Sequence, residues 1–488
     1  MKYQTLVKSA VSGAIFAAAF TASAEDTATT YDLNGTGGAW SDSSTWATGT
    51  VPTTTKLDTV KVSSDNANLI VDSDATLGYF DISSVNNFDV SIADGKTFTF
   101  GGAYAGESGD RNKKITFNGN GTLSFGVARE ALDNASSKAS YVFNTKVKFA
   151  LGDTWLQRSS FTFNNDVEFS GGQVVARSGG EAADFYFNKG TVDVKSTHFN
   201  FVDCKSIYVG KDVNLFNSAS GRGAGFNNLT LEGSMTLYGE RTGWGIRFAT
   251  MFGGNTTFGS TAVLKQMKGS TSNLRNIFYG NITVEDGADL QFAQAISFGR
   301  RSWEDTVNLT LNGKNSIKTI NSDGSVSGQG GTNFVLKRQT GVTGDAAGTE
   351  TLDYVKLNVT LNADNDFGVF QFYGNSVLTL DTNGKNVSIK GFEALTEELA
   401  SSSVNVYFKN LVDNTVRIYD KKGIELSEEG QSTNVFFYDA DNNAMGVFLK
   451  DAGDGSYWIN TTAVPEPATY AALFGLAALG FALYRRRR

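Results

Sequence analysis

Between its two ends, the chain alternates apolar and polar residues in short runs, and the repeats that contain them recur after 20 to 28 residues except across a few longer intervals. Alternation with period two, built from β-branched and aromatic residues, is typical of half-buried β-strands. The pattern therefore predicts many short strands separated by turns. The clearest runs cover residues 122–125, 147–149, 167–169, 192–194, 229–231, 282–284, 309–311, 359–361 and 378–380.

Each of these runs is short, and many follow a phenylalanine and an asparagine. Four closely matching tetrapeptides end at Asn118, Asn144, Asn164 and Asn188, and three variants end at Asn255, Asn281 and Asn375. Repeats of this length are typical of stacked coils. We expect each coil to place its phenylalanine on the next phenylalanine inside and its asparagine beside the next asparagine at a turn.

Two all-β architectures fit strands at this spacing, a hairpin sandwich and a parallel β-helix. A sandwich requires no single phenylalanine and asparagine per period, so the repeat favours a right-handed parallel β-helix, with the hand taken from the crossover rule. Residues 53–463 lack proline, as expected where every central strand donates to its neighbours.

The pattern divides the chain into five segments. These are a signal peptide at 1–24, an N-terminal cap at 25–63, the β-helix repeats at 64–390, an antiparallel C-terminal β cap and stem at 391–463, and a terminal segment at 464–488. Caps are expected because end coils expose unpaired backbone and apolar side chains.

The N-terminal cap is marked by two tryptophans, Trp40 and Trp46, followed by Pro52 and by Asp58 before an alternating run. This arrangement is similar to the entry segment of many secreted β-helix and autotransporter-type passengers. The resemblance implies that the tryptophans close the core. The alternative is a pair of rings that stack on sugar.

The first 24 residues have the form of a secretory signal peptide. Lys2 and Lys8 precede and flank an apolar stretch, and Ala22 and Ala24 form a small-residue cleavage site. We expect a signal helix, passage through the Sec translocon and removal of the leader.

The C-terminus has three parts in a fixed order. The motif Val464, Pro465, Glu466 and Pro467 comes first. An uncharged run at residues 468–484 follows, about 25 Å long as a helix and thus sufficient for a single transmembrane helix across a thin bilayer. The chain closes with Arg485, Arg486, Arg487 and Arg488, which should stop translocation and stay in the cytoplasm.

This tail resembles the PEP-CTERM sorting signal of Gram-negative bacteria. The resemblance implies processing by an exosortase that recognises residues 465–467, with the chemistry residing in that enzyme. The protein would then be exported, held in the inner membrane as a precursor, and finally placed at the cell surface, in the outer envelope or outside the cell. Exopolysaccharide or envelope components are the partners that this location implies.

The composition excludes several classes of function. The single His and single Cys exclude most zinc-enzyme layouts and any disulfide framework, so we expect no metal and no cofactor. The chain carries 42 positive and 50 negative residues, and six of the positive residues lie in the two terminal segments. Nucleic acid is therefore not an expected partner.

No cluster of residues predicts catalysis. His198 lies in an alternating strand without a nucleophile motif, Cys204 is a lone thiol, and the loop from Asp439 departs from the calcium-binding pattern at Ala444 and Lys450. The densest charged group, residues 300–305, combines arginines and carboxylates with Trp303.

We therefore predict a structural or adhesive protein of the cell surface or extracellular matrix that is not an enzyme. A polysaccharide lyase or hydrolase on the same fold is the first alternative, with residues 300–305 as its candidate cleft. An autotransporter-type passenger is the second, although it requires a C-terminal membrane barrel.

Overall fold

The computed structural model of the chain describes residues 28–486 apart from internal gaps. These gaps are residues 55–57, 108, 127–137, 151–152, 157, 171–172, 176–181, 196–197, 202–203, 218–223, 240–248, 269–274, 294, 300–305, 322–323, 337–354, 396–401 and 464–466. The predicted signal helix at 1–24 lies outside the described residues.

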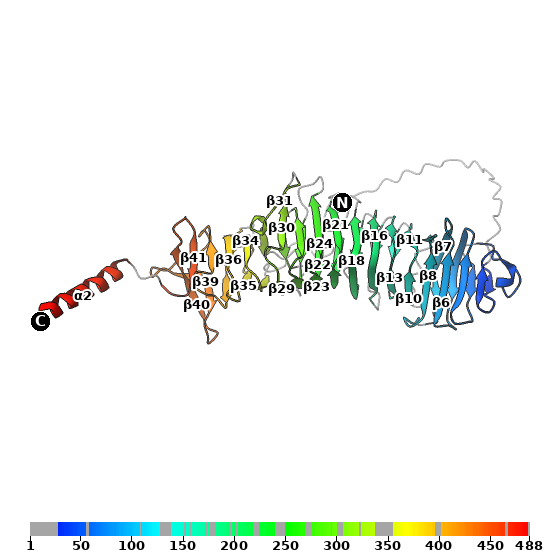
Figure 1. Ribbon diagram of the computed structural model, residues 1–488, viewed down its shortest axis with the longest axis horizontal. Coiled ribbons are helices and arrows are strands. Elements are labelled where there is room, and N and C mark those ends of the chain that lie inside the picture. The colour runs from blue at the N-terminus through cyan, green and yellow to red at the C-terminus, as the bar shows by residue number, and fades with distance from the viewer. Residues whose placement is uncertain are drawn as a thin grey trace, which may run out of the picture.

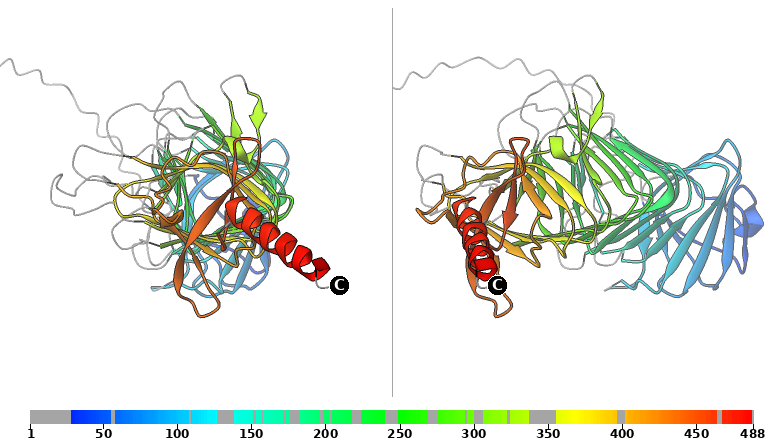
Figure 2. Two further views of the ribbon diagram at one scale, coloured as in Figure 1. Left: turned by 90° about the vertical axis from the view of Figure 1, so that its left-hand side faces the viewer. Right: turned by 60° about the vertical axis from the view of Figure 1, so that its left-hand side comes forward.

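The body is an all-β solenoid, as the repeat predicts. Its strands lie across the long axis of an extended rod (Figure 1), and the end-on view in Figure 2 shows successive coils wound around a common interior. Nearly every pairing joins a strand to the strand one coil later in parallel. The predicted right-handed sense stays a prediction.

The first face of the solenoid is an unbroken parallel stack. Its strands, in order, are β2 (Gly37–Ala39), β4 (Ala67–Val71), β6 (Asn87–Ile92), β8 (Lys114–Gly119), β10 (Ser140–Phe143), β13 (Ser160–Phe163), β16 (Asp184–Val194), β18 (Ser206–Asn217), β20 (Leu229–Leu231), β23 (Asn255–Phe258), β26 (Gly280–Val284), β29 (Thr306–Leu311), β33 (Lys356–Leu361), β35 (Val377–Asp381), β37 (Val406–Lys409) and β39 (Gln431–Tyr438).

The second face contains β5 (Ala75–Asp81), β7 (Thr97–Tyr104), β9 (Thr122–Phe125), β11 (Lys146–Phe149), β14 (Val167–Phe169), the later parts of β16 and β18, β21 (Ser234–Gly239), β24 (Val263–Lys268), β27 (Asp289–Phe292) and β30 (Ile317–Ile320). The third face contains β12 (Asp153–Trp155), β15 (Gln173–Val175), β17 (His198–Phe201), β19 (Ala224–Asn227), β22 (Ala249–Gly253), β25 (Arg275–Phe278), β28 (Ile296–Phe298), β32 (Phe334–Leu336) and the later parts of β34 (Asn365–Phe372) and β36 (Val387–Ala394).

The remaining elements lie at the ends and at one insertion. They are β1 (Thr30–Asp32), β3 (Thr59–Lys61), the 3-10 turns η1 (Ser43–Thr45) and η3 (Gln329–Gly331), β31 (Val326–Ser327), β38 (Val416–Ile418), β40 (Ala444–Asp451), β41 (Tyr457–Asn460) and the helix α2 (Pro467–Arg486). Parallel pairing extends through β38 and β39, and the antiparallel cap is built by β40 and β41.

The core is a set of aromatic columns that run along the rod. In β8, β10 and β13 every second side chain is buried, as their alternating sequences predict. Phe143 stacks on Phe117 with ring centroids 5.6 Å apart and on Phe163 at 4.9 Å. Each such pair adds about 0.5–1.5 kcal/mol to the burial of apolar area.

Asparagine ladders connect the coils on the outside. The Nδ2 of Asn144 donates to Oδ1 of Asn118 over 2.8 Å, and Asn164 donates to Asn144 in the same way. A second ladder joins Asn255, Asn281, Asn308 and Asn358 over 2.8–2.9 Å. The predicted stacking of amides between coils is thus observed.

The two sets of tetrapeptides do not occupy the same position in the coil, however. The expectation that every coil places its repeated phenylalanine and asparagine at one common position is therefore wrong. Phe117 and Phe187 lie on the first face, whereas Phe252 and Phe278 pair with each other on the third. The two ladders accordingly occupy different corners of the coil. Asn375 extends neither, because Thr379 takes the position beside Asn358.

Trp40 and Trp46 close the N-terminal end of the core. Both rings are 1% exposed, their centroids lie 5.2 Å apart, and Nε1 of Trp46 donates to the carbonyl of Trp40 over 3.0 Å. Trp40 also contacts Phe98. Rings buried in this way cannot stack on a sugar, so the structure supports the cap and excludes the alternative.

An insertion interrupts the second face after β30. Gln329 is fully buried there; its Oε1 accepts from the backbone N–H of Ile317 over 3.1 Å, and its Nε2 donates to Asn365 over 3.0 Å. The side chain therefore provides the links between β30 and β34 that a strand would otherwise make.

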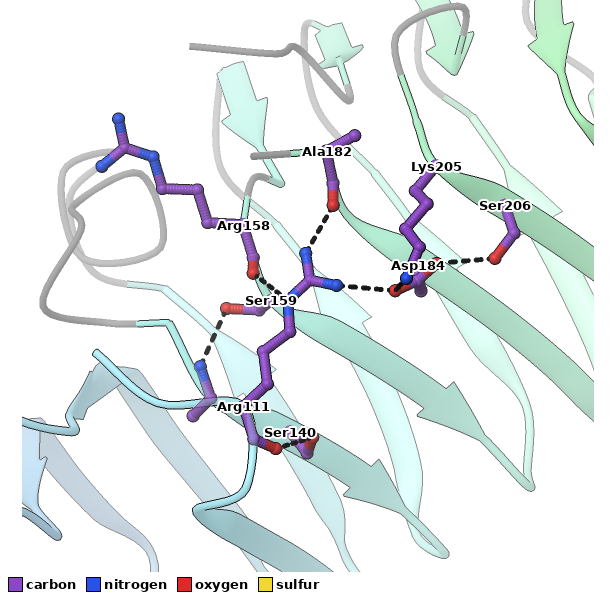
Figure 3. A network of polar contacts seen from close by, with 9 residues as sticks. Arg111, Ser140, Arg158, Ser159, Ala182, Asp184, Lys205 and Ser206 are labelled. Carbon is purple, nitrogen blue, oxygen red and sulfur yellow. Dashed lines mark hydrogen bonds and ion pairs between the residues drawn. The ribbon is translucent and has the colours of Figure 1, made fainter. Parts of the chain in front are cut away.

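A network of hydrogen bonds around Arg111 and Asp184, which we call the Arg111 staple, joins several coils where the first face begins (Figure 3). The guanidinium of Arg111 donates to Asp184 over 2.7 Å, to the carbonyl of Arg158 over 2.7 Å and to the carbonyl of Ala182. Asp184 is buried and also accepts from the hydroxyl of Ser206. Because β8, β10, β13, β16 and β18 follow one another in the stack, one arginine holds several coils together.

Candidate functional site

The end of the body is fixed by one carboxylate. Oδ1 of Asp413 accepts from the backbone N–H of Thr461 over 2.6 Å and from its hydroxyl over 2.9 Å, and Oδ2 accepts from the hydroxyl of Thr462 over 3.0 Å. Asn414 donates its backbone N–H to Asn460 nearby. The chain is therefore held against the body up to the residue before Ala463.

These hydrogen bonds determine the ionisation of the carboxyl. Partial burial alone would raise the pKa of Asp413, but the donors from Thr461 and Thr462, together with the charge of Lys450, outweigh burial and lower the pKa. Asp413 is therefore ionised at neutral pH. We call Asp413, together with Thr461 and Thr462 that donate to it, the Asp413 clamp.

After this clamp the chain continues into α2, which projects from the end of the rod (Figure 1). All side chains described in this helix, residues 471–486, are exposed. The largest apolar ones are 58–73% exposed: Leu473, Phe474, Leu476, Leu479, Phe481, Leu483 and Tyr484. Burying such a group is favourable by about 1.5–3 kcal/mol, so contact with an apolar environment would stabilise the helix.

Among the described residues, no helix is both long and apolar enough to cross a membrane.

Two groups of aromatic rings and cations lie in the C-terminal cap. On the second face, Arg417 lies between the rings of Tyr419 and Trp458, at 5.2 and 5.4 Å from their centroids, and Lys421 lies 5.1 Å from Tyr457. We call these five residues the cap patch.

The other group lies on the first face. The ring of Tyr407 stacks on Phe436 and Tyr438 at 5.3 and 5.5 Å, and Nζ of Lys409 lies 5.7 Å from the ring centroid of Tyr438.

Residues 463–488 match the PEP-CTERM protein-sorting motif. The match begins at the residue after the Asp413 clamp and covers the whole of α2. It indicates sorting that depends on an exosortase, and a protein that is exported and anchored to a membrane before processing. No curated protein and no solved structure matches the chain.

The structure places only part of the predicted sorting site. Val464, Pro465 and Glu466 lie outside the described residues, as do Arg487 and Arg488; Pro467 begins α2, and Arg485 and Arg486 end it. Ala22 and Ala24 at the predicted signal cleavage site also lie outside them.

The other residues considered for chemistry lie in separate parts of the chain. Cys204 is buried and donates to the carbonyl of Phe201, His198 lies in β17, and Asp439 accepts backbone N–H groups of its own hairpin turn. Residues 300–305 lie outside the described part of the chain. Within that part, no three His, Cys, Asp or Glu residues are grouped as metal ligands.

Two features of this end were missed from the sequence, the Asp413 clamp and the cap patch. Asp413 and Thr461 are 48 residues apart, and no periodic pattern connects them. For the cap patch a signal existed, since residues 415–421 mix aromatic with basic side chains and residues 457–458 are both aromatic.

Proposed function

We propose that this protein is a structural or adhesive component of the cell surface or extracellular matrix and has no enzymatic activity of its own. Exported through the Sec translocon, it would be held in the inner membrane by α2 and released or transferred by an exosortase to the outer envelope or the surrounding polymer. The observation that carries the proposal is the sorting motif at 463–488, which directly follows a clamped, all-β rod.

The form of the body supports a structural role. Its interior is filled by aromatic columns and its outer asparagines bond to one another, so much of the repeated sequence serves to extend the rod. A long, rigid body of this kind suits a spacer or a scaffold in exopolysaccharide.

The anchoring role of α2 rests on its exposed apolar side chains and its terminal arginines. Leu476→Arg would place a charge near the middle of the apolar run at a cost of about 2.5–3.5 kcal/mol. We expect this variant to leave the membrane fraction, while Leu476→Val stays in it. Equal retention of both variants would contradict a transmembrane helix.

Sorting is tested with Pro465→Ala combined with Pro467→Ala. The full chain carrying both changes should accumulate uncleaved in the inner membrane and disappear from the surface. Glu428→Ala combined with Glu429→Ala, in an exposed turn of the cap, is the matched control and should sort normally. Unchanged delivery of the proline variant would contradict exosortase recognition of this motif.

The rival enzyme is tested separately. Purified protein is incubated with acidic and neutral polysaccharides, and released saccharides are measured. We expect no release. Release that Glu304→Gln abolishes would establish the lyase or hydrolase alternative and overturn the structural one.

A further inference from the structure

Within the cap patch, Tyr457 is opposite the buried Ile418 and packs against the core, whereas Arg417, Tyr419 and Trp458 lie on the outer side. Arg417 and Trp458 are directly opposed on β38 and β41, so both project from the same side of the sheet. Tyr419 is 51% exposed, and Lys421 lies beyond it on the following turn. The surface thus offers amphipathic aromatic groups beside positive charge.

The cap patch carries little net positive charge. Arg417 pairs with Asp454 and donates to Ser456 over 2.5 Å, and the hydrogen bond from Arg417 is the main reason that the pKa of Asp454 falls to about 2. Lys421 is exposed, and its Nζ lies 5.1 Å from the ring centroid of Tyr457. A strongly acidic polymer therefore has little reason to choose this surface over any other.

The position of the cap patch is fixed relative to the tail. Trp458 lies three residues before Thr461, which Asp413 holds to the body. From Thr461 to Pro467, where α2 begins, the chain takes six residue-to-residue steps and spans at most about 20 Å. Wherever the helix is embedded, the cap patch must lie within this short reach of it.

Tyrosine and tryptophan concentrate at membrane–water interfaces, where one edge of the ring is apolar and the other is hydrated. Lysine and arginine beside them attract lipid phosphates. The interfacial layer is about 5–7 Å thick on each side of the hydrocarbon. Rings and cations arranged as in the cap patch match this layer.

We propose that the cap patch rests on the lipid headgroup layer while the tail anchors the precursor. The proposal rests on the membrane anchoring described under the proposed function. Because the tether is short, the effective concentration of the surface near the lipid reaches the millimolar range, so weak contacts suffice. The contact would hold Ala463, the first residue of the matched sorting motif, at the depth of the headgroups, where a membrane enzyme meets the motif.

The test uses the full chain reconstituted into vesicles of phosphatidylethanolamine and phosphatidylglycerol and, for comparison, the same chain in detergent. Hydroxyl-radical oxidation of Tyr419 and Trp458 and acetylation of Lys421 are measured by mass spectrometry. We expect labelling of these residues to fall several-fold in vesicles. Tyr438 and Lys409, the equivalent pair on the first face, should label equally in both states.

A pair of double variants provides the matched comparison. Tyr419→Ser with Lys421→Glu should restore labelling of Trp458 in vesicles, whereas Tyr438→Ser with Lys409→Glu should leave its protection unchanged. Both change exposed or half-exposed side chains of the same kinds.

The outcomes separate the two proposals. If the chain sediments with vesicles but the cap patch labels as in detergent, membrane docking is overturned and anchoring stands. If protection falls equally on both faces, the surface is not specific and docking is again overturned. If the chain does not associate with vesicles at all, anchoring and docking both fail.

Discussion

Asn358 donates its side-chain amide to Oδ1 of Asn308 over 2.9 Å, although the two residues are 50 positions apart in the chain. The neighbouring steps of the same ladder, from Asn255 to Asn281 and on to Asn308, are 26 and 27 positions. The coil between Asn308 and Asn358 contains the insertion, yet the spacing along the rod is unchanged. Sheet register, and not chain length, therefore sets the ladder.

Asn308 both donates to Asn281 and accepts from Asn358. Asn308→Ala removes both bonds, and we expect the free energy of unfolding to fall by about 1–2 kcal/mol. Asn308→Asp keeps the acceptor and should lose about half as much. Ser260→Ala, at an exposed turn, is the control. Denaturant unfolding of the three variants checks the order, and an equal effect of Asn308→Ala and Ser260→Ala would show that the ladder contributes nothing.

The aromatic column gives a larger effect. Phe143 is fully buried between Phe117 and Phe163, so Phe143→Ala leaves a cavity and should cost about 3–5 kcal/mol. Phe143→Leu fills part of that space and should cost less. Thermal unfolding of both variants, with the exposed Tyr238→Ala as control, measures the difference. A loss below 1 kcal/mol for Phe143→Ala would contradict a packed column.

The Arg111 staple is tested by removing one partner and then both. Arg111→Met leaves the buried Asp184 with Ser206 and the more distant Lys205, 3.7 Å away, as its partners among the described side chains, and should destabilise the rod by about 2–3 kcal/mol. Adding Asp184→Asn should recover part of that loss, because the uncompensated charge disappears. Lys114→Met, at an exposed neighbouring cation, should change little. Additive losses in the double variant would show that Arg111 and Asp184 do not interact.

The features of the fold that could be predicted from the sequence are those that are local and repeated. Asn118, Asn144 and Asn164 predicted a ladder because each follows an inward phenylalanine at a corner, and the sorting tail is one contiguous segment. The prediction that Asn255 and Asn281 share the position of the first asparagines in the coil was wrong. Different corners of a coil, where a buried ring precedes a turn, have the same local sequence pattern.

Contacts between distant residues gave no comparable signal. Arg111 meets Asp184 across 73 positions, and Gln329 replaces a missing strand after an insertion. Such interactions depend on which coils come to lie side by side. A single sequence does not show which strands pair, and so it does not show which of these residues meet.

The Asp413 clamp gives a prediction about pH. The hydrogen bonds lower the pKa of Asp413 in the folded protein, whereas the unfolded chain titrates near pH 3.9. The stabilisation is therefore complete above that value and is lost as the pH falls through the lower pKa of the folded state. We expect acid to release Thr461 and Thr462 and to expose the stem before the sorting motif.

Hydrogen exchange of the Thr461 amide and limited proteolysis of residues 461–466 in the full chain, both followed as the pH is lowered, measure this release. Asp413→Asn retains an acceptor but cannot ionise, so its exchange should be faster at neutral pH and should lack the extra acid-dependent step. Asp441→Asn, in the exposed hairpin turn of the cap, should behave as the unchanged protein. An acid-dependent step that persists in Asp413→Asn would assign the pH response to another group.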